Sequence, residues 1–151
     1  AAKEKGAEIE FIHLLDWDIQ YCSGCVACSR GLVMGKGMIC SRQDDFKAFY
    51  EKVVEADGVL FVDPIFESGA TGLYHSITDR MGPGHDTGMM MMLDGKLKEA
   101  GKEGLNPRYF RQKAISFVGI GGSDWAVRCE TDHAMFALSP GSSKQRVLLL
   151  V

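Results

Sequence analysis

Four of the five cysteines in this chain fall between residues 22 and 40, namely Cys22, Cys25, Cys28 and Cys40, whereas Cys129 is remote. Two residues separate each neighbouring pair among the first three. This is the ferredoxin pattern, in which one short loop wraps a face of an iron–sulfur cubane and a fourth thiolate closes the site. Zinc sites more often use two separated pairs of ligands. The spacing therefore predicts a [4Fe–4S] cluster on these four cysteines, with zinc or metal-free thiols as alternatives.

The insert before the fourth cysteine is long for this pattern, and no proline follows Cys40. Gly24 and Gly31 are expected to ease the tight wrapping of the loop. Secreted disulfide scaffolds usually spread an even number of cysteines along a short chain. Clustered thiols instead favour metal or redox ligands in a reducing compartment. Because the sequence shows no signal peptide or membrane-spanning run, we expect a cytoplasmic protein.

The composition is that of one ordinary globular domain. The chain has 151 residues, 46% of them hydrophobic and 25% charged, with a net charge of −3. This charge gives no general attraction to nucleic acid or anionic lipid, and no apolar run approaches the roughly 20 residues that span a bilayer. Residues 1–6 lack the apolar stretch of a signal peptide. We expect a single domain over residues 1–151, with a cysteine-rich loop at 22–40 and no nucleic-acid or membrane partner.

Strand and helix patterns alternate along the chain. We expect strands at 8–15, 59–62 and 114–118, and helices opened by Asp44 and Asp45 and at 73–81, 94–102 and 125–138. This alternation predicts an α/β fold with a doubly wound parallel sheet. Ligands of such sheets bind beyond the carboxyl ends of the strands. The loops at 22–40, 63–72 and 119–124 are therefore expected to share one sheet edge.

The chain ends on an apolar run, Val147-Leu-Leu-Leu-Val151. Such a run suits the middle of a sheet rather than its edge. We therefore predict that residues 146–151 form the first strand of a sheet of order 2-1-3-4(-5), in a circularly permuted or reordered chain. Pairing with both the 9–14 and the 58–62 strands would support this prediction. The alternative is a last strand beside 114–118.

Three stretches of the sequence resemble the central part of NAD(P)H-dependent FMN reductases, which have a flavodoxin-like fold. They are the apolar strand segment Ala56–Phe66, the pair Ser68-Gly69 and the helix end Ile77–Arg80. The cysteine run leading into two aspartates is similar to the iron–sulfur flavoprotein branch of that family, and the resemblance covers roughly residues 7–125. Two departures are visible. Phe66 stands where the family usually has tyrosine, and the family's phosphate-binding loop is absent, although it would follow Val151 in the strand order above.

The resemblance implies an FMN site built by two loops at the carboxyl ends of strands. Small residues let the backbone approach the flat isoalloxazine ring, and exposed amides serve its polar edge. No side chain is assigned acid–base work, because the flavin carries the chemistry. On local sequence alone, ordinary turns would also explain both loops. The residues assigned to FMN are Pro64, Ile65, Phe66, Glu67, Ser68, Gly69, Gly119, Gly121, Gly122, Ser123 and Asp124.

The leading hypothesis is an FMN-dependent oxidoreductase that relays electrons between a [4Fe–4S] cluster and FMN, with NAD(P)H as a donor that the resemblance suggests. One alternative is a cluster-free NAD(P)H-dependent FMN or quinone reductase. Another is a non-enzymatic metal-binding or electron-carrier module. The expected partners are small-molecule or protein electron donors and acceptors. The resemblance also implies a homodimer or homotetramer in which a neighbour helps to close the flavin pocket.

Overall fold

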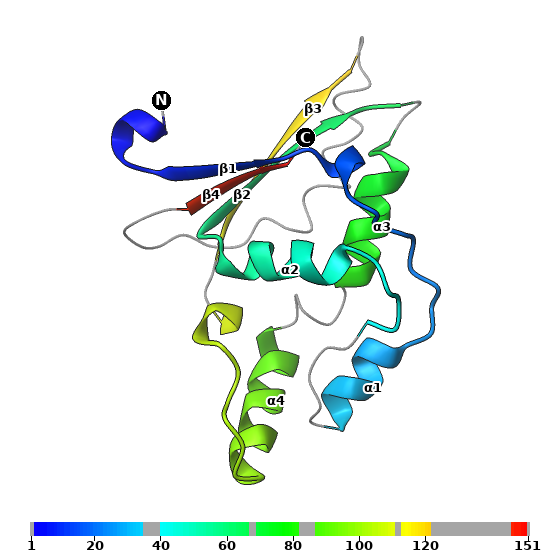
Figure 1. Ribbon diagram of the computed structural model, residues 1–151, viewed down its shortest axis with the longest axis vertical. Coiled ribbons are helices and arrows are strands. Elements are labelled where there is room, and N and C mark those ends of the chain that lie inside the picture. The colour runs from blue at the N-terminus through cyan, green and yellow to red at the C-terminus, as the bar shows by residue number, and fades with distance from the viewer. Residues whose placement is uncertain are drawn as a thin grey trace.

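The centre of the molecule is a four-stranded parallel sheet of order β1-β4-β2-β3. Figure 1 shows the computed structural model, which describes residues 2–34, 40–66, 69–81, 87–110, 113–121 and 146–150. The strands are β1 (Glu8–Ile12), β2 (Gly58–Pro64), β3 (Ala114–Ile120) and β4 (Arg146–Leu150). The predicted α/β class with a parallel sheet is confirmed.

Strand β4 lies between β1 and β2. Val147 is in register with Ile9 on one side and with Gly58 on the other. An apolar run therefore occupies the middle of the sheet, as its composition favours, and not a place beside β3. Counting β4 as the first strand gives the order 2-1-3-4. The permuted or reordered chain itself, and a fifth strand, stay predictions.

Four α-helices are described: α1 (Ala27–Val33), α2 (Phe46–Glu55), α3 (Gly72–Met81) and α4 (Thr87–Glu99), with 3-10 turns at Lys3–Lys5, Leu14–Asp16 and Pro107–Phe110. Helices α2 and α3 match the expected ones. The expected helix at 125–138 lies outside the described residues. No helix in the described part of the chain is both long enough and apolar enough to cross a bilayer.

Three element boundaries differ from expectation. The first strand stops at Ile12 instead of residue 15, because Leu14 turns into the core within a 3-10 turn. Helix α4 begins at Thr87 rather than 94, because Met90 and Leu93 both point into the interior and extend the helical face backwards. Helix α1 was not expected at all, and it places Gly31 inside a helix rather than in a wrapping loop.

The core lies between the sheet and helices α2 and α3, which lie below the sheet in Figure 1. The apolar face predicted for α2 is buried, with Phe46, Phe49 and Tyr50 among its members. Phe61 of β2 meets the Tyr74 ring of α3 edge-on at 5.6 Å between centroids. Each fully buried side chain of this kind contributes roughly 1.5–3 kcal/mol. This packing fixes the ends of β2 and α3, where the candidate site begins.

Candidate functional site

The loop after β2 is tied at both ends by one carboxylate. Asp63, only 8% exposed, accepts hydrogen bonds from the Thr71 backbone N–H at 2.9 Å and from the Thr71 hydroxyl at 2.7 Å. The Thr71 hydroxyl oxygen accepts in turn from the Tyr74 N–H at 3.2 Å, which caps the first turn of α3. The segment between Asp63 and Thr71 therefore leaves the sheet and returns to a helix at fixed points.

This loop meets the loop after β3. The Ile65 N–H donates to the Ile120 carbonyl oxygen at 2.9 Å, and the Ile65 side chain is 4% exposed. Two glycines pack on that side chain. A Cβ added to Gly119 would lie 2.8 Å from Ile65 Cδ1, and one added to Gly121 would lie 3.2 Å from Ile65 Cβ. Two of the loops expected to share a sheet edge are thus joined there.

The joined loops present apolar groups and bare backbone to solvent. Phe66 is 67% exposed, Ile120 is 60% exposed, and Pro64, Gly119 and Gly121 are also exposed. The Gly69 N–H donates to the Phe66 carbonyl oxygen at 3.2 Å, so the backbones of these two residues lie side by side. An aromatic side chain beside glycine backbone is a surface that a flat heteroaromatic ring can stack on and approach closely. These residues therefore fit an isoalloxazine ring.

The remaining residues assigned to FMN, Glu67, Ser68, Gly122, Ser123 and Asp124, lie outside the described residues, as does Val151, after which a phosphate-binding loop was expected. The described residues therefore bear on binding of the isoalloxazine ring of FMN and not on binding of its phosphate.

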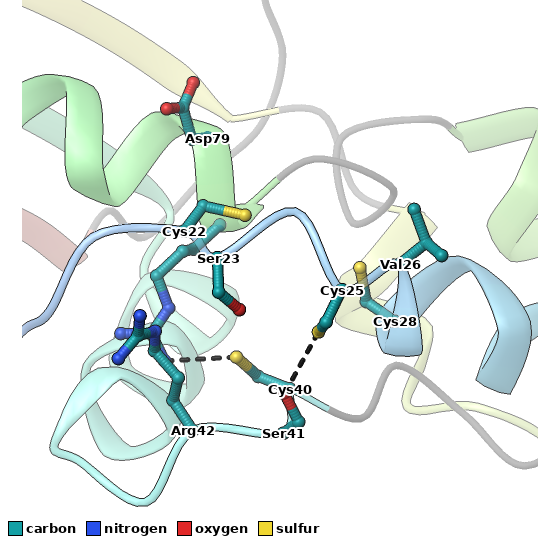
Figure 2. Close-up of a pocket in the computed structure, with 10 residues that line it drawn as sticks. Cys22, Ser23, Cys25, Val26, Cys28, Cys40, Ser41, Arg42 and Asp79 are labelled. Carbon is teal, nitrogen blue, oxygen red and sulfur yellow. Dashed lines mark hydrogen bonds between the residues drawn. The ribbon is translucent and has the colours of Figure 1, made fainter.

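All four clustered cysteines line one pocket. They come from the segment before α1, from the first turn of α1 and from the chain returning to α2 (Figure 2). Cys22 and Cys25 are exposed, whereas Cys28 and Cys40 are half-buried. Gly24 and Val26 both have positive φ, 65° and 51°. Positive φ is expected of glycine but is costly for a β-branched valine. The backbone between Cys22 and Cys28 is therefore turned sharply, as a loop that wraps a ligand must be.

The pocket brings the thiols together without gathering them on one point. Within the described ranges, no group of three or more histidine, cysteine or acidic side chains is placed to share a single metal ion. A cubane takes each thiolate on a different iron atom, so its donors are spread around a larger body. Four thiols around one pocket would suit a group larger than a single ion, and the assignment of a [4Fe–4S] cluster to them stays a prediction.

The Cys25 thiol has a lowered pKa. Cys25 Sγ lies 3.0 Å from Ser41 Oγ, and Figure 2 shows this contact as a dashed line. The hydrogen bond from Ser41, helped by the Ala27 N–H, lowers the pKa of Cys25 to about 7. The thiolate is the form of cysteine that binds metal. Ser41 therefore favours the ligating form of a thiol at the pocket.

Arg80, at the end of α3, forms a buried ion pair with Asp44 beside the pocket. The two side chains are 1% and 0% exposed, and the pair is bidentate, with Arg80 Nη2 donating to Asp44 Oδ1 at 2.8 Å and Nη1 donating to Oδ2. Arg80 Nη2 also lies 3.1 Å from Cys40 Sγ. The hydrogen bonds from Arg80 hold the pKa of Asp44 below its ordinary value. Burial works against the charge of Arg80, but its hydrogen bonds to Asp44 and Cys40 raise its pKa nonetheless.

Sequence reasoning missed this ion pair. Arg80 entered only as part of a helix end that resembles a family, and Asp44 only as an acid at a helix start. A signal was present, because an arginine on the apolar side of a short helix needs a buried acid as partner. The choice of partner, however, depends on a contact between residues 36 positions apart.

The expectation that all three loops share one sheet edge is wrong for the cysteines. The pocket borders Asp79 and Arg80 at the C-terminal end of α3, whereas the loop after β2 meets the N-terminal end at Thr71. A ten-residue helix separates them, which is roughly 15 Å at 1.5 Å per residue. In Figure 1 the chain after β1 runs down beside α3 to α1. The cysteine loop starts near the sheet edge and then carries its thiols away from it.

Comparisons with known proteins find a matching family and several relatives. The NADPH-dependent FMN reductase family matches residues 1–139. An iron–sulfur flavoprotein of Archaeoglobus fulgidus is 30% identical over 124 residues, which is 82% of this chain and 51% of that protein. An iron–sulfur flavoprotein of Methanocaldococcus jannaschii is 32% identical over 78 residues, 52% of this chain and 37% of that protein.

Among solved structures, a flavone reductase matches with a TM-score of 0.70 and 38% sequence identity, over 99% of this chain and 45% of that one. The chain thus spans about half the length, or less, of these relatives. The flavodoxin-like fold expected from the resemblance is confirmed. Because the family match extends over most of the residues, including both loops assigned to FMN and all four clustered cysteines, the chain belongs to the NADPH-dependent FMN reductase family.

Proposed function

We propose that this chain is the flavin-binding part of an FMN-dependent oxidoreductase that takes electrons from NAD(P)H. The observation that carries this proposal is the joined pair of loops, in which the Ile65 N–H donates to the Ile120 carbonyl and leaves Phe66 exposed beside glycine backbone. Family membership supports the choice of FMN as the ligand. FMN, when bound, supplies the redox chemistry.

The chain's own residues bind and orient the ring. Phe66 offers an aromatic face, and Gly119 and Gly121, which carry no Cβ, pack closely on Ile65 and so keep the loop after β3 against the loop after β2. Asp63 and Thr71 hold the loop in this shape from behind. We assign no proton transfer to a side chain here. Specificity for the substrate then depends on what covers the exposed edge of the ring.

We further propose that Cys22, Cys25, Cys28 and Cys40 hold a [4Fe–4S] cluster, which would supply single-electron transfer. The shared pocket, the acidic Cys25 thiol and the names of the iron–sulfur flavoprotein relatives support this assignment. An electron relay between cluster and flavin would have to cover roughly the length of α3 within one chain. We also propose a homodimer or homotetramer, because in the resembling proteins a neighbouring subunit helps to close the flavin pocket. Exposed Phe66 and Ile120 offer a surface that such a neighbour could cover.

A cluster-free NAD(P)H-dependent reductase is the second candidate. It is favoured by the long insert between Cys28 and Cys40 and by the absence of a proline after Cys40, both of which depart from the ferredoxin pattern. The two candidates share the flavin site and differ at the cysteines alone.

One preparation separates the candidates. The full chain is purified without oxygen, and FMN, iron and acid-labile sulfide are counted per chain. We expect one FMN with four irons and four sulfides, and loss of the iron in Cys28→Ser. Cys129→Ser is the matched control, because it removes the cysteine outside the cluster of four and should keep the iron. One FMN without iron would establish the cluster-free reductase, and a chain that binds neither would contradict both.

A further inference from the structure

We propose that Arg80 is a positioning residue for the four-thiol pocket. Its guanidinium is held by Asp44, donates to Cys40 Sγ and so holds this thiol in place before a cluster binds. The inference rests on the proposed cluster for its redox consequence. Its structural part, that Arg80 holds Cys40 and the cysteine loop in the metal-free chain, does not depend on whether a cluster binds.

The placement of the Arg80 guanidinium leaves it little freedom. It lies over the Phe46 ring at 4.2 Å, and Nη1 donates to the Gln20 carbonyl at 3.0 Å while both terminal nitrogens bind Asp44. Nη2 then reaches Cys40 Sγ at 3.1 Å. Cys40 itself is partly buried against the core. One thiol of the four is thus held by a buried cation and by apolar packing together.

The other cysteines have a different environment. Cys25 shares a hydrogen bond with the neutral hydroxyl of Ser41, and Cys22 and Cys25 are exposed. A cluster ligand that accepts from a guanidinium has its negative charge compensated, which tunes both affinity and reduction potential. Arg42 lines the same pocket with the same charge, but it stacks on Tyr21 and binds Gln20 Oε1. Variants of these two arginines can therefore distinguish the effect of a direct hydrogen bond to a thiol from the effect of a positive charge near the pocket.

The ion pair also closes the base of the cysteine loop. The Gln20 N–H donates to Asp44 Oδ2 at 3.0 Å, and the Asp18 N–H donates to Asp45 Oδ2 at 2.8 Å, while the Asp45 N–H returns a bond to the Asp18 carbonyl. Arg80 joins both sides, because it binds the Gln20 carbonyl and Asp44 at once. The loop is therefore closed before any ligand binds.

The first test uses the reduced, metal-free chain. Amide hydrogen exchange is followed over residues 18–20 in the wild type, Arg80→Gln and Arg42→Gln. We expect exchange to accelerate at least tenfold in Arg80→Gln. In Arg42→Gln we expect it to accelerate less than threefold, because the Arg42 guanidinium donates to the side-chain oxygen of Gln20. Equal exchange in wild type and Arg80→Gln would overturn the positioning role, whether or not the protein binds a cluster.

The second test uses the chain reconstituted with iron and sulfide, and it measures iron retained per chain and the midpoint potential of the cluster. Removing a donor from a thiolate disfavours the reduced, more negative state. We expect Arg80→Gln to lower the midpoint potential by at least 59 mV, a tenfold change in the equilibrium constant for one electron. Arg42→Gln should shift it by less than about 28 mV, a threefold change. Equal potentials in wild type and Arg80→Gln, or equal shifts in both variants, would overturn the inference and leave the proposed cluster intact.

A double variant guards against misfolding. Asp44→Leu with Arg80→Met replaces the pair by apolar groups and leaves no orphan charge, a change that buried pairs often tolerate. We expect it to fold, as judged by bound FMN, and to have a lower midpoint potential than the wild type. The shift should be smaller than in Arg80→Gln, because the negative charge of Asp44 is removed as well. A folded double variant with the wild-type potential contradicts the role of Arg80. If the wild type binds no cluster while Arg80→Gln still exchanges faster, the proposed cluster fails and the positioning of the loop stands.

Discussion

Asp63 holds Thr71 by two hydrogen bonds, one to the backbone N–H and one to the hydroxyl, and in this way shapes the loop that would receive the flavin ring. Asp63→Asn replaces one of the two accepting oxygens with an NH2 group, which donates and cannot accept. Because hydrogen bonds to charged groups contribute about 1.5–3 kcal/mol, we expect a loss of that order in stability and a roughly tenfold weaker affinity for FMN. Fluorescence titration of FMN measures the affinity.

Thr71→Ser is the matched control for that experiment, since serine keeps both donors that Asp63 accepts. It should bind FMN within about threefold of the wild type, given that its backbone and hydroxyl are unchanged. Wild-type affinity in Asp63→Asn would show that this pair does not shape the flavin loop.

Gly119 touches Ile65 so closely that the two positions should be energetically coupled. A Cβ at residue 119 would lie 2.8 Å from Ile65 Cδ1, so Gly119→Ala is expected to cost about 1–3 kcal/mol through overpacking. Ile65→Val removes the atom in conflict. In that background Gly119→Ala should cost at least about 0.5 kcal/mol less. Urea unfolding of the four proteins measures the coupling, and additive costs would refute the contact.

The sequence allows prediction of the parts of this fold that depend on local patterns. Apolar residues spaced by three and four positions predicted the buried face of α2. An unbroken apolar run predicted the central position of β4 in the sheet. Helix α1 escaped prediction because it has seven residues with a glycine in the middle, too short for periodicity to show. The cysteine spacing predicted the shared pocket, but not its distance from the sheet edge. That distance depends on contacts such as Arg80 with Asp44, and a local pattern carries no information about them.

Asp44 should give the protein a steep loss of stability in acid. Its pKa in the folded state is below the ordinary value, because Arg80 stabilises the carboxylate. The stabilisation is therefore complete above the unfolded value of about 3.9 and is lost as the pH falls through the folded value. Asp44→Asn should reduce this fall in stability at low pH, which we call the acid limb of the stability curve. It should also lower the free energy of unfolding by about 3–5 kcal/mol at neutral pH, since Arg80 is left buried and unpaired. Urea unfolding from pH 2.5 to 7 measures both effects.

The neighbouring acid on α3 provides the control for the pH experiment. Asp79 lines the same pocket but is exposed, so Asp79→Asn should keep the acid limb of the wild type. Loss of the limb in Asp79→Asn, or its persistence in Asp44→Asn, would assign the acid sensitivity to another group.

Cys25 should be alkylated at a lower pH than an ordinary cysteine. Its pKa is lowered to about 7, chiefly by the Ser41 hydroxyl, so the reactive thiolate predominates above pH 7. In the reduced, metal-free chain, the rate of iodoacetamide labelling at Cys25 should rise with a midpoint near that value. Ser41→Ala should move the midpoint upward, towards the ordinary 8.5. Ser23→Ala should move it less, because Ser23 is a smaller cause. Peptide mass spectrometry follows the labelling, and an unchanged midpoint in Ser41→Ala would contradict the assignment.

Strand β4 should be indispensable for folding, because it is the bonding partner of two strands at once. Five of its residues are in register with β1 and four with β2. At about 1 kcal/mol net per hydrogen bond, deleting residues 146–151 should cost about 5 kcal/mol or more and abolish the cooperative urea transition. Deleting Val151 alone is the control, because β4 ends at Leu150. If the longer deletion changed the free energy of unfolding by less than about 1 kcal/mol, the central place of β4 would be wrong, and with it the reason to regard this segment as the first strand of the sheet.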